Sequence, residues 1–176
     1  VYLFFFNRKT KASPTHKDIK TFCKCFYRVY LCERTVIDSS MHFDYWTLNK
    51  NGDYYYLGSL FEDKRSQNKI FIDTRTNRIT ETLWRTGRLY KFLKVPEDVL
   101  VECRIEHGGL TNRALTAANH LRTFTLRERK SSANMVAVEL VASIKELNDL
   151  DSLQSLVHKS IKSVTEVFDA FVPSKE

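Results

Sequence analysis

The chain has 176 residues, of which 43% are hydrophobic, including 12 Phe and 8 Tyr, and its formal net charge is +7. This apolar content is enough for a core, so it excludes a wholly disordered chain, and we expect one domain over residues 1–176. The longest wholly apolar run, Val1–Phe6, is far shorter than the roughly 20 residues that span a bilayer, so we expect no transmembrane segment.

Charge is unevenly distributed along the chain. Residues 1–35 carry 8 Lys and Arg against 2 Asp and Glu, and residues 64–130 carry 15 against 7. Residues 36–63 and 131–176 are acidic instead, with 1 against 5 and 4 against 7. This pattern indicates an anionic partner for the basic blocks, self-association between unlike faces, or a basic surface that is only solvated.

The N-terminal third predicts a strand, a helix and a hairpin. The apolar run Val1–Phe6 is typical of a strand buried on both faces. A serine followed by a proline marks the start of a helix over about Pro14–Tyr27. Residues 28–37 are strand-like, and the Asn-Lys-Asn-Gly-Asp turn at 49–53 precedes a strand over 54–57.

The middle of the chain predicts an antiparallel meander. We expect the polar segment FEDKRSQN, at 61–68, to be a solvated loop. Segments 68–74, 77–84 and 87–95 are typical of short strands separated by polar breaks. The clearest strand is 99–106, where apolar and charged residues alternate so that one face is core and the other is wet.

The C-terminal part predicts a short helix, a strand and a long helix. Gly108-Gly109 ends the preceding strand, and apolar residues at helical spacing predict a helix within 110–124. Met135–Ile144 is strand-like, and Asn148-Asp149 caps a helix that continues to Val172. The predicted fold class is therefore α+β, an antiparallel β-sheet (meander) packed by an N-terminal helix, a short middle helix and a long C-terminal helix.

The four cysteines do not predict a disulfide scaffold or a metal site. Cys23, Cys25 and Cys32, with His16, include zinc-ligand types, but a Cys-x-Cys pair in a helix points its thiolates about 200° apart. Packing is the simpler role for these thiols, and Cys103 lies on the buried side of its predicted strand. We expect no metal, no cofactor, and reduced thiols in the cytoplasm or nucleus.

Catalytic motifs are absent from the sequence. It contains no G-x-S-x-G, no H-E-x-x-H, no phosphate-binding glycine loop and no dinucleotide fingerprint. His107 stands before Gly108-Gly109 at a strand end, where active-site loops occur. A hydrolase that uses His107 is our third hypothesis. Because the catalytic motifs are absent, we expect that the protein is not an enzyme.

A basic and aromatic stretch, TLWRTGRLYKFLK at 82–94, supports our first hypothesis. Nucleic-acid binding without base specificity needs cations near phosphates and aromatic faces on which bases stack. If 88–95 is a strand, alternation exposes Tyr90 and Phe92 between cations and turns Leu89 inward. The predicted nucleic-acid site comprises Arg75, Arg78, Trp84, Arg85, Arg88, Tyr90, Lys91, Phe92, Lys94, Arg113, Arg122, Arg127, Arg129 and Lys130.

Two partner hypotheses follow from these features. The first is a basic protein that binds RNA or single-stranded DNA through this strand surface. The alternative is a structural or assembly protein of the viral matrix or nucleocapsid-associated type. Such a protein self-associates and contacts nucleoprotein or an anionic membrane surface, where each Lys or Arg gains about 1 kcal/mol.

Overall fold

The computed structural model describes residues 2–8, 36–37, 43–49, 52–60, 62, 66–119, 122–124 and 130–168. Within these, side chains are described for residues 45–49, 52–60, 62, 66–117 and 130–168. The predicted helix over Pro14–Tyr27 and the thiols of Cys23, Cys25 and Cys32 lie outside the described residues.

The main sheet is antiparallel and has six strands, in the order β2-β3-β4-β1-β6-β9. The strands are β1 (Tyr2–Arg8), β2 (Val36–Ile37), β3 (Phe43–Leu48), β4 (Tyr54–Gly58), β6 (Leu100–Gly108) and β9 (Met135–Ser143). Strands β1, β4, β6 and β9 confirm the strands predicted at those positions. The mixed α and β composition with an antiparallel sheet is also confirmed.

The turn between β3 and β4 forms as predicted. Asn49 N–H donates to the carbonyl of Asp53 at 2.8 Å, and Gly52 N–H donates to the carbonyl of Asn49 at 2.9 Å. Gly52 has a φ of 94°, a conformation that side chains disfavour and glycine adopts at low cost. The turn sets the register that pairs Leu48 with Tyr54.

A second, smaller sheet replaces the predicted middle helix. Strand β7 (Ala114–Asn119) pairs in parallel with β5 (Lys69–Phe71) and antiparallel with β8 (Arg122–Phe124). The prediction of a helix within 110–124 is therefore wrong. The apolar residues of this segment suit a short helix or a short buried strand equally. Backbone pairing with β5, which is distant in the sequence, favours the strand.

Helix α3 (Ile72–Phe92) replaces most of the predicted meander. Of the three strands expected over 68–95, only the first begins as one, in β5. Threonine hydroxyls in this segment form hydrogen bonds within the helix. They donate to the carbonyl four residues earlier, as from Thr82 to Arg78 and from Thr86 to Thr82, both at 2.8 Å.

The C-terminal helix is confirmed, with one addition. Helix α4 (Ile144–Asn148) follows β9 directly, and Ser143 and Glu146 cap its start reciprocally. Helix α5 (Leu150–Val167) begins at the predicted cap, where Asp149 accepts from Ser152 N–H at 3.0 Å. The predicted helix end at Val172 lies outside the described residues.

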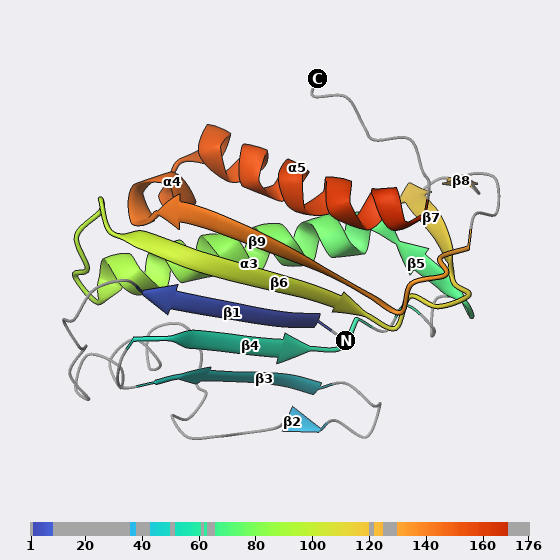
Figure 1. The fold of residues 1–176 in the computed structure, drawn as a ribbon, viewed down its shortest axis with the longest axis horizontal. Coiled ribbons are helices and arrows are strands. Elements are labelled where there is room, and N and C mark those ends of the chain that lie inside the picture. The colour runs from blue at the N-terminus through green and yellow to red at the C-terminus, as the bar shows by residue number, and fades with distance from the viewer. Residues whose placement is uncertain are drawn as a thin grey trace.

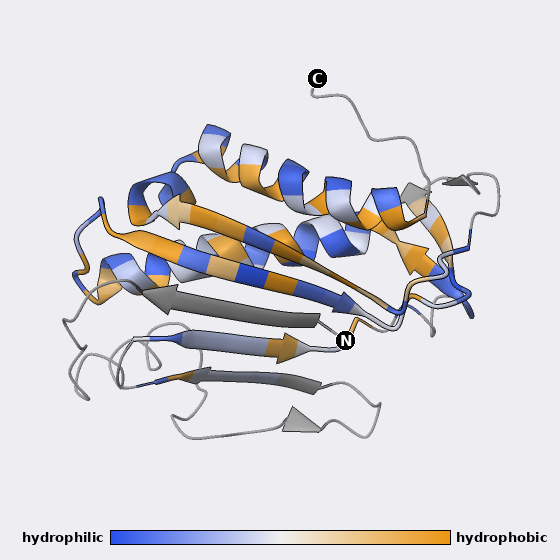
Figure 2. Ribbon diagram, in the orientation of Figure 1, coloured by the Kyte–Doolittle hydropathy of each residue, from blue (hydrophilic) through white to orange (hydrophobic). Residues whose placement is uncertain are grey.

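The helices pack on one face of the main sheet. Figure 1 shows α3 passing behind the sheet and α5 running along its β9 side. Their core side chains, such as Leu83 on α3 and Val157 on α5, join inward residues of β6 and β9 in one apolar cluster. A second cluster around Phe168 and Leu115 joins the end of α5 to the smaller sheet. Figure 2 shows hydrophobic and hydrophilic residues alternating along β6, as expected for a sheet covered on one face.

Candidate functional site

The outer side of α3 brings together an aromatic ring and several cations from the predicted site. Trp84 is 39% exposed, and the guanidinium carbon of Arg88 lies 4.7 Å from the centre of its ring, within cation–π range. Lys91 follows one turn later on the same side of the helix. We call the following residues the α3 basic surface: Arg78, Trp84, Arg85, Arg88 and Lys91.

Carboxylates lie beside these cations. Arg78 donates to Glu81 at 3.0 Å, Arg85 also pairs with Glu81, and Lys91 lies 3.0 Å from Glu97. All five side chains are at least 30% exposed, so water and salt screen these pairs. Each pair is therefore worth about 0.2–1 kcal/mol, and a phosphate group can compete with the carboxylates for the cations.

Two residues of the predicted site are buried. Tyr90 is fully buried, and its hydroxyl donates to the carbonyl of Gly52 at 2.8 Å, so it ties α3 to the β3–β4 turn. Arg75 is also fully buried. The expectation that Tyr90 lies on an exposed strand face is wrong, because on a helix it shares the inner side with Leu83 and Ile79.

The remaining predicted residues are scattered. Phe92 is partly buried in the last turn of α3, and Lys94 is exposed just beyond it. Lys130 is exposed, and Arg113 is largely buried beside Arg75. The side chains of Arg122, Arg127 and Arg129 lie outside the described side chains.

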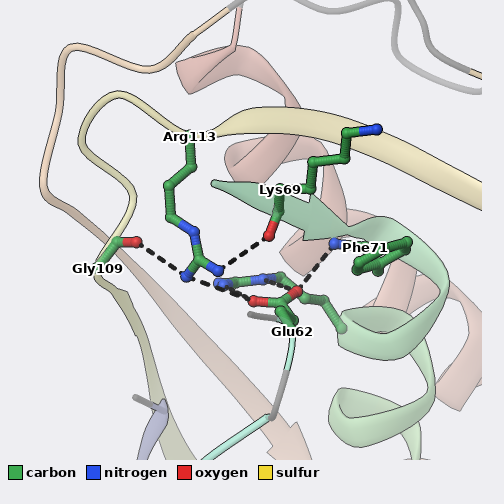
Figure 3. Close-up of polar contacts among 6 residues, drawn as sticks. Glu62, Lys69, Phe71, Gly109 and Arg113 are labelled. Carbon is green, nitrogen blue, oxygen red and sulfur yellow. Dashed lines mark hydrogen bonds and ion pairs between the residues drawn. The ribbon is translucent and has the colours of Figure 1, made fainter. Parts of the chain in front are cut away.

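A buried ionic cluster joins α3, β5 and the loop before β7 (Figure 3). The carboxylate of Glu62 accepts two bonds from Arg75, at 3.2 and 2.7 Å, and a third from Phe71 N–H at 2.9 Å. Arg113 lies 3.9 Å from the same carboxylate and donates to the carbonyl of Lys69 at 2.9 Å. The cluster thus pins the start of α3 to the smaller sheet.

This cluster is the main polar feature that the sequence did not predict. Glu62 lies in a segment expected to be a solvated loop, yet it is 4% exposed. Its pairing to Arg75 spans 13 residues, and no local pattern marks such a pair. Because the carboxylate accepts three hydrogen bonds and is enclosed, we assign it a structural role.

His107 is buried on the core side of β6 and is not open to solvent. Burial, followed by the nearby Arg75 cation, lowers the pKa of its imidazole to about 3. The catalytic role in our third hypothesis would require a path for substrate to this enclosed ring.

The lowered pKa predicts an acid-sensitive fold. Between pH 6.5 and 3 the unfolded state holds a proton on His107 that the folded state does not, so acid favours unfolding. We expect the free energy of unfolding to fall by up to about 1.4 kcal/mol for each pH unit below 6. Urea titrations from pH 7 to pH 4.5 measure this slope.

The control for this slope is His107→Gln, which keeps the other four of the 5 histidines. The variant should lose the part of the slope that belongs to His107, whatever its stability at pH 7. Parallel pH profiles for the two proteins would contradict the assignment.

Metal-ligating and thiol chemistry is limited in the described part of the chain. Burial raises the pKa of the Cys103 thiol to about 12, so it stays protonated at neutral pH. Among the described residues, no group of three or more His, Cys, Asp or Glu side chains could hold a metal ion. Within the same residues, no helix is long and apolar enough to cross a membrane.

Comparisons of the chain with protein-family models, with curated proteins and with solved structures found no match. The function must therefore be inferred from the site alone. The α3 basic surface is accessible, whereas the Glu62 cluster is enclosed, and only the former can meet a large partner.

Proposed function

We propose that this protein is a non-enzymatic binding protein that holds RNA or single-stranded DNA on the α3 basic surface. The observation that carries this proposal is the Arg88 guanidinium stacked on the exposed Trp84 ring, with Arg85 and Lys91 nearby on the helix. Cations beside an accessible aromatic face are what binding to a single strand requires.

The physical basis differs from the strand surface expected from the sequence. Since Tyr90 is buried, the aromatic contribution rests mainly on Trp84, and one stacked base is worth about 1–3 kcal/mol. The remaining affinity comes from phosphate contacts with the α3 cations. Binding should therefore weaken steeply as salt rises.

A double charge reversal tests this function. We expect Arg88→Glu combined with Lys91→Glu to weaken binding of a fluorescent single-stranded oligonucleotide. The slope of log affinity against log salt should become shallower by about 1.4, because two phosphate contacts are lost at about 0.7 each on a single strand. Fluorescence anisotropy at several salt concentrations measures both quantities.

The matched control is Lys159→Glu combined with Lys162→Glu, which makes the same change in net charge at two exposed positions of α5. It should retain most of the affinity and the slope. If the two double variants lose equal affinity, binding depends on net charge and not on the α3 basic surface. If the wild-type affinity does not change with salt, the electrostatic mechanism is wrong.

A further inference from the structure

The face of β6 and β9 that points away from the helices is a second accessible surface, separate from α3. Leu100, Met135 and Val141 lie on it and are 45%, 53% and 55% exposed, three of the five large hydrophobic side chains that are exposed in the described chain. Leu100 and Val141 lie near one end of this face and Met135 lies at the other end, so exposed apolar surface flanks the charged centre on both sides. We call the following residues the β6–β9 face: Leu100, Glu102, Arg104, Glu106, Gly108, Met135, Ala137, Glu139, Val141 and Ser143.

Charges on the β6–β9 face indicate what kind of partner it fits. Arg104 bonds to Glu106 at 2.8 Å and to Glu139 at 2.7 Å, and Glu102 lies one cross-strand pair away from that row. The face therefore carries more carboxylates than cations. The excess of carboxylates repels a phosphate polymer or an anionic membrane, whereas the central Arg104–Glu139 row offers one charge of each sign to a protein surface.

We propose that the β6–β9 face binds the same face of a second copy of this chain. Arg104 and Glu139 are opposite each other at the middle of two nine-residue strands. A two-fold axis parallel to the strands, between β6 and β9, places β6 of one copy over β9 of the other. Arg104 then lies over Glu139 of the second copy, and the reverse holds as well.

The same operation brings compatible neighbours together along the strands. Met135 lies over Gly108, where no side chain takes up space, and Val141 lies over the stem of Glu102. Two sheets packed in this aligned way cross at about 30°. Because the strands of the two copies diverge away from the crossing point, the central Arg104–Glu139 row stays closest to its partner row.

Charge excludes the other two-fold arrangement of this face. An axis perpendicular to the strands through the central row would place Arg104 over Arg104 and Glu139 over Glu139 of the second copy. Like charges in direct opposition disfavour an interface. Only the parallel axis makes the face complementary to itself.

A charge-swap experiment tests the arrangement. Sedimentation velocity of the wild-type chain should show a monomer–dimer equilibrium without nucleic acid. Arg104→Glu alone and Glu139→Arg alone should each dissociate at least about tenfold more readily, because each meets like charge in its own second copy. A 1:1 mixture of the two variants should restore the dimer, since each then meets opposite charge across the interface.

Two further measurements decide the outcome. Val141→Glu, which places a carboxylate over Glu102 of the second copy, should give a monomer that keeps the wild-type circular dichroism spectrum. A strictly monomeric wild-type chain, a mixture that stays monomeric, or a dimer that persists in Val141→Glu would each overturn the proposal. The nucleic-acid test changes residues of α3 and α5 and none of the β6–β9 face, so either proposal can fail without the other.

Discussion

Replacing Glu62 with glutamine is expected to lower the free energy of unfolding by about 3–5 kcal/mol. The amide keeps the shape of the carboxylate but removes the charge that balances Arg75, which is fully buried. An uncompensated guanidinium inside the protein is costly because its hydration is lost. Since domains of this size unfold at about 5–15 kcal/mol, the loss should be visible as a large decrease in the urea midpoint.

The matched control is Glu81→Gln. This carboxylate also pairs with two arginines, Arg78 and Arg85, but all three side chains lie at the surface of α3. Its replacement should cost no more than about 1 kcal/mol. If the two variants lose similar stability, burial does not govern the strength of the Glu62 cluster.

A double replacement separates the value of the ion pair from the cost of an orphaned charge. Glu62→Met combined with Arg75→Met removes both charges and fills the space with apolar side chains. We expect the double variant to be more stable than Glu62→Gln. A double variant at least as unstable as Glu62→Gln would mean that the pair itself supplies the stability.

Replacing Gly87 with alanine is expected to destabilise the protein, although alanine is the better helix former. A Cβ atom at this position would lie 2.8 Å from the Cβ of Leu147 and 3.0 Å from its carbonyl oxygen. Neither atom belongs to a flexible side-chain end, so α4 must shift away from α3. We expect this overpacking to cost about 1–3 kcal/mol. Alanine gains about 1 kcal/mol in helix propensity over glycine, so the net loss of stability is up to about 2 kcal/mol.

Two variants sharpen this test of helix packing. Gly87→Leu should be less stable than Gly87→Ala, because its larger side chain displaces α4 further. Asn77→Ala, at an exposed position of the same helix, should be slightly more stable than the wild-type chain. Urea unfolding of all three measures the effect. A stabilised Gly87→Ala would show that α4 yields without cost.

The packing of Gly87 also explains an error in the sequence-based prediction. The sequence-based prediction placed a break between two strands at 85–87, a segment that includes this glycine. In the structure it is a site of close contact between α3 and α4, and the chain continues as one helix through it. Nothing near Gly87 in the sequence shows that Leu147 lies against it.

Helices and strands whose apolar residues recur with a clear period could be predicted from the sequence. The alternation of Val101, Cys103 and Ile105 with charged residues specified β6 and its buried face. The stripe of Leu153, Val157 and others, together with the Asp149 cap, specified α5 and its start. In these segments the local preference of the chain and the demands of the core agree.

The candidate site shows the same division. The sequence places Trp84, Arg85, Arg88 and Lys91 near one another because they are close along the chain, and α3 keeps them on its outer side. It wrongly added Tyr90 to their exposed face, because the face that a residue occupies depends on whether the period is 2 or 3.6. The segment is a helix with a period of 3.6, and Tyr90 is buried against the β3–β4 turn, which is distant in the sequence.

The sequence by itself therefore determined the mixed α and β class, strands β1, β4, β6 and β9, helix α5 and the location of the basic segment. Only the tertiary structure decided that α3 is a helix, that β7 pairs with β5, and that Glu62 is a buried partner of Arg75. The physical reason is the same in each case. These features depend on contacts between residues far apart in the chain, whose burial and pairing outweigh weak local propensities.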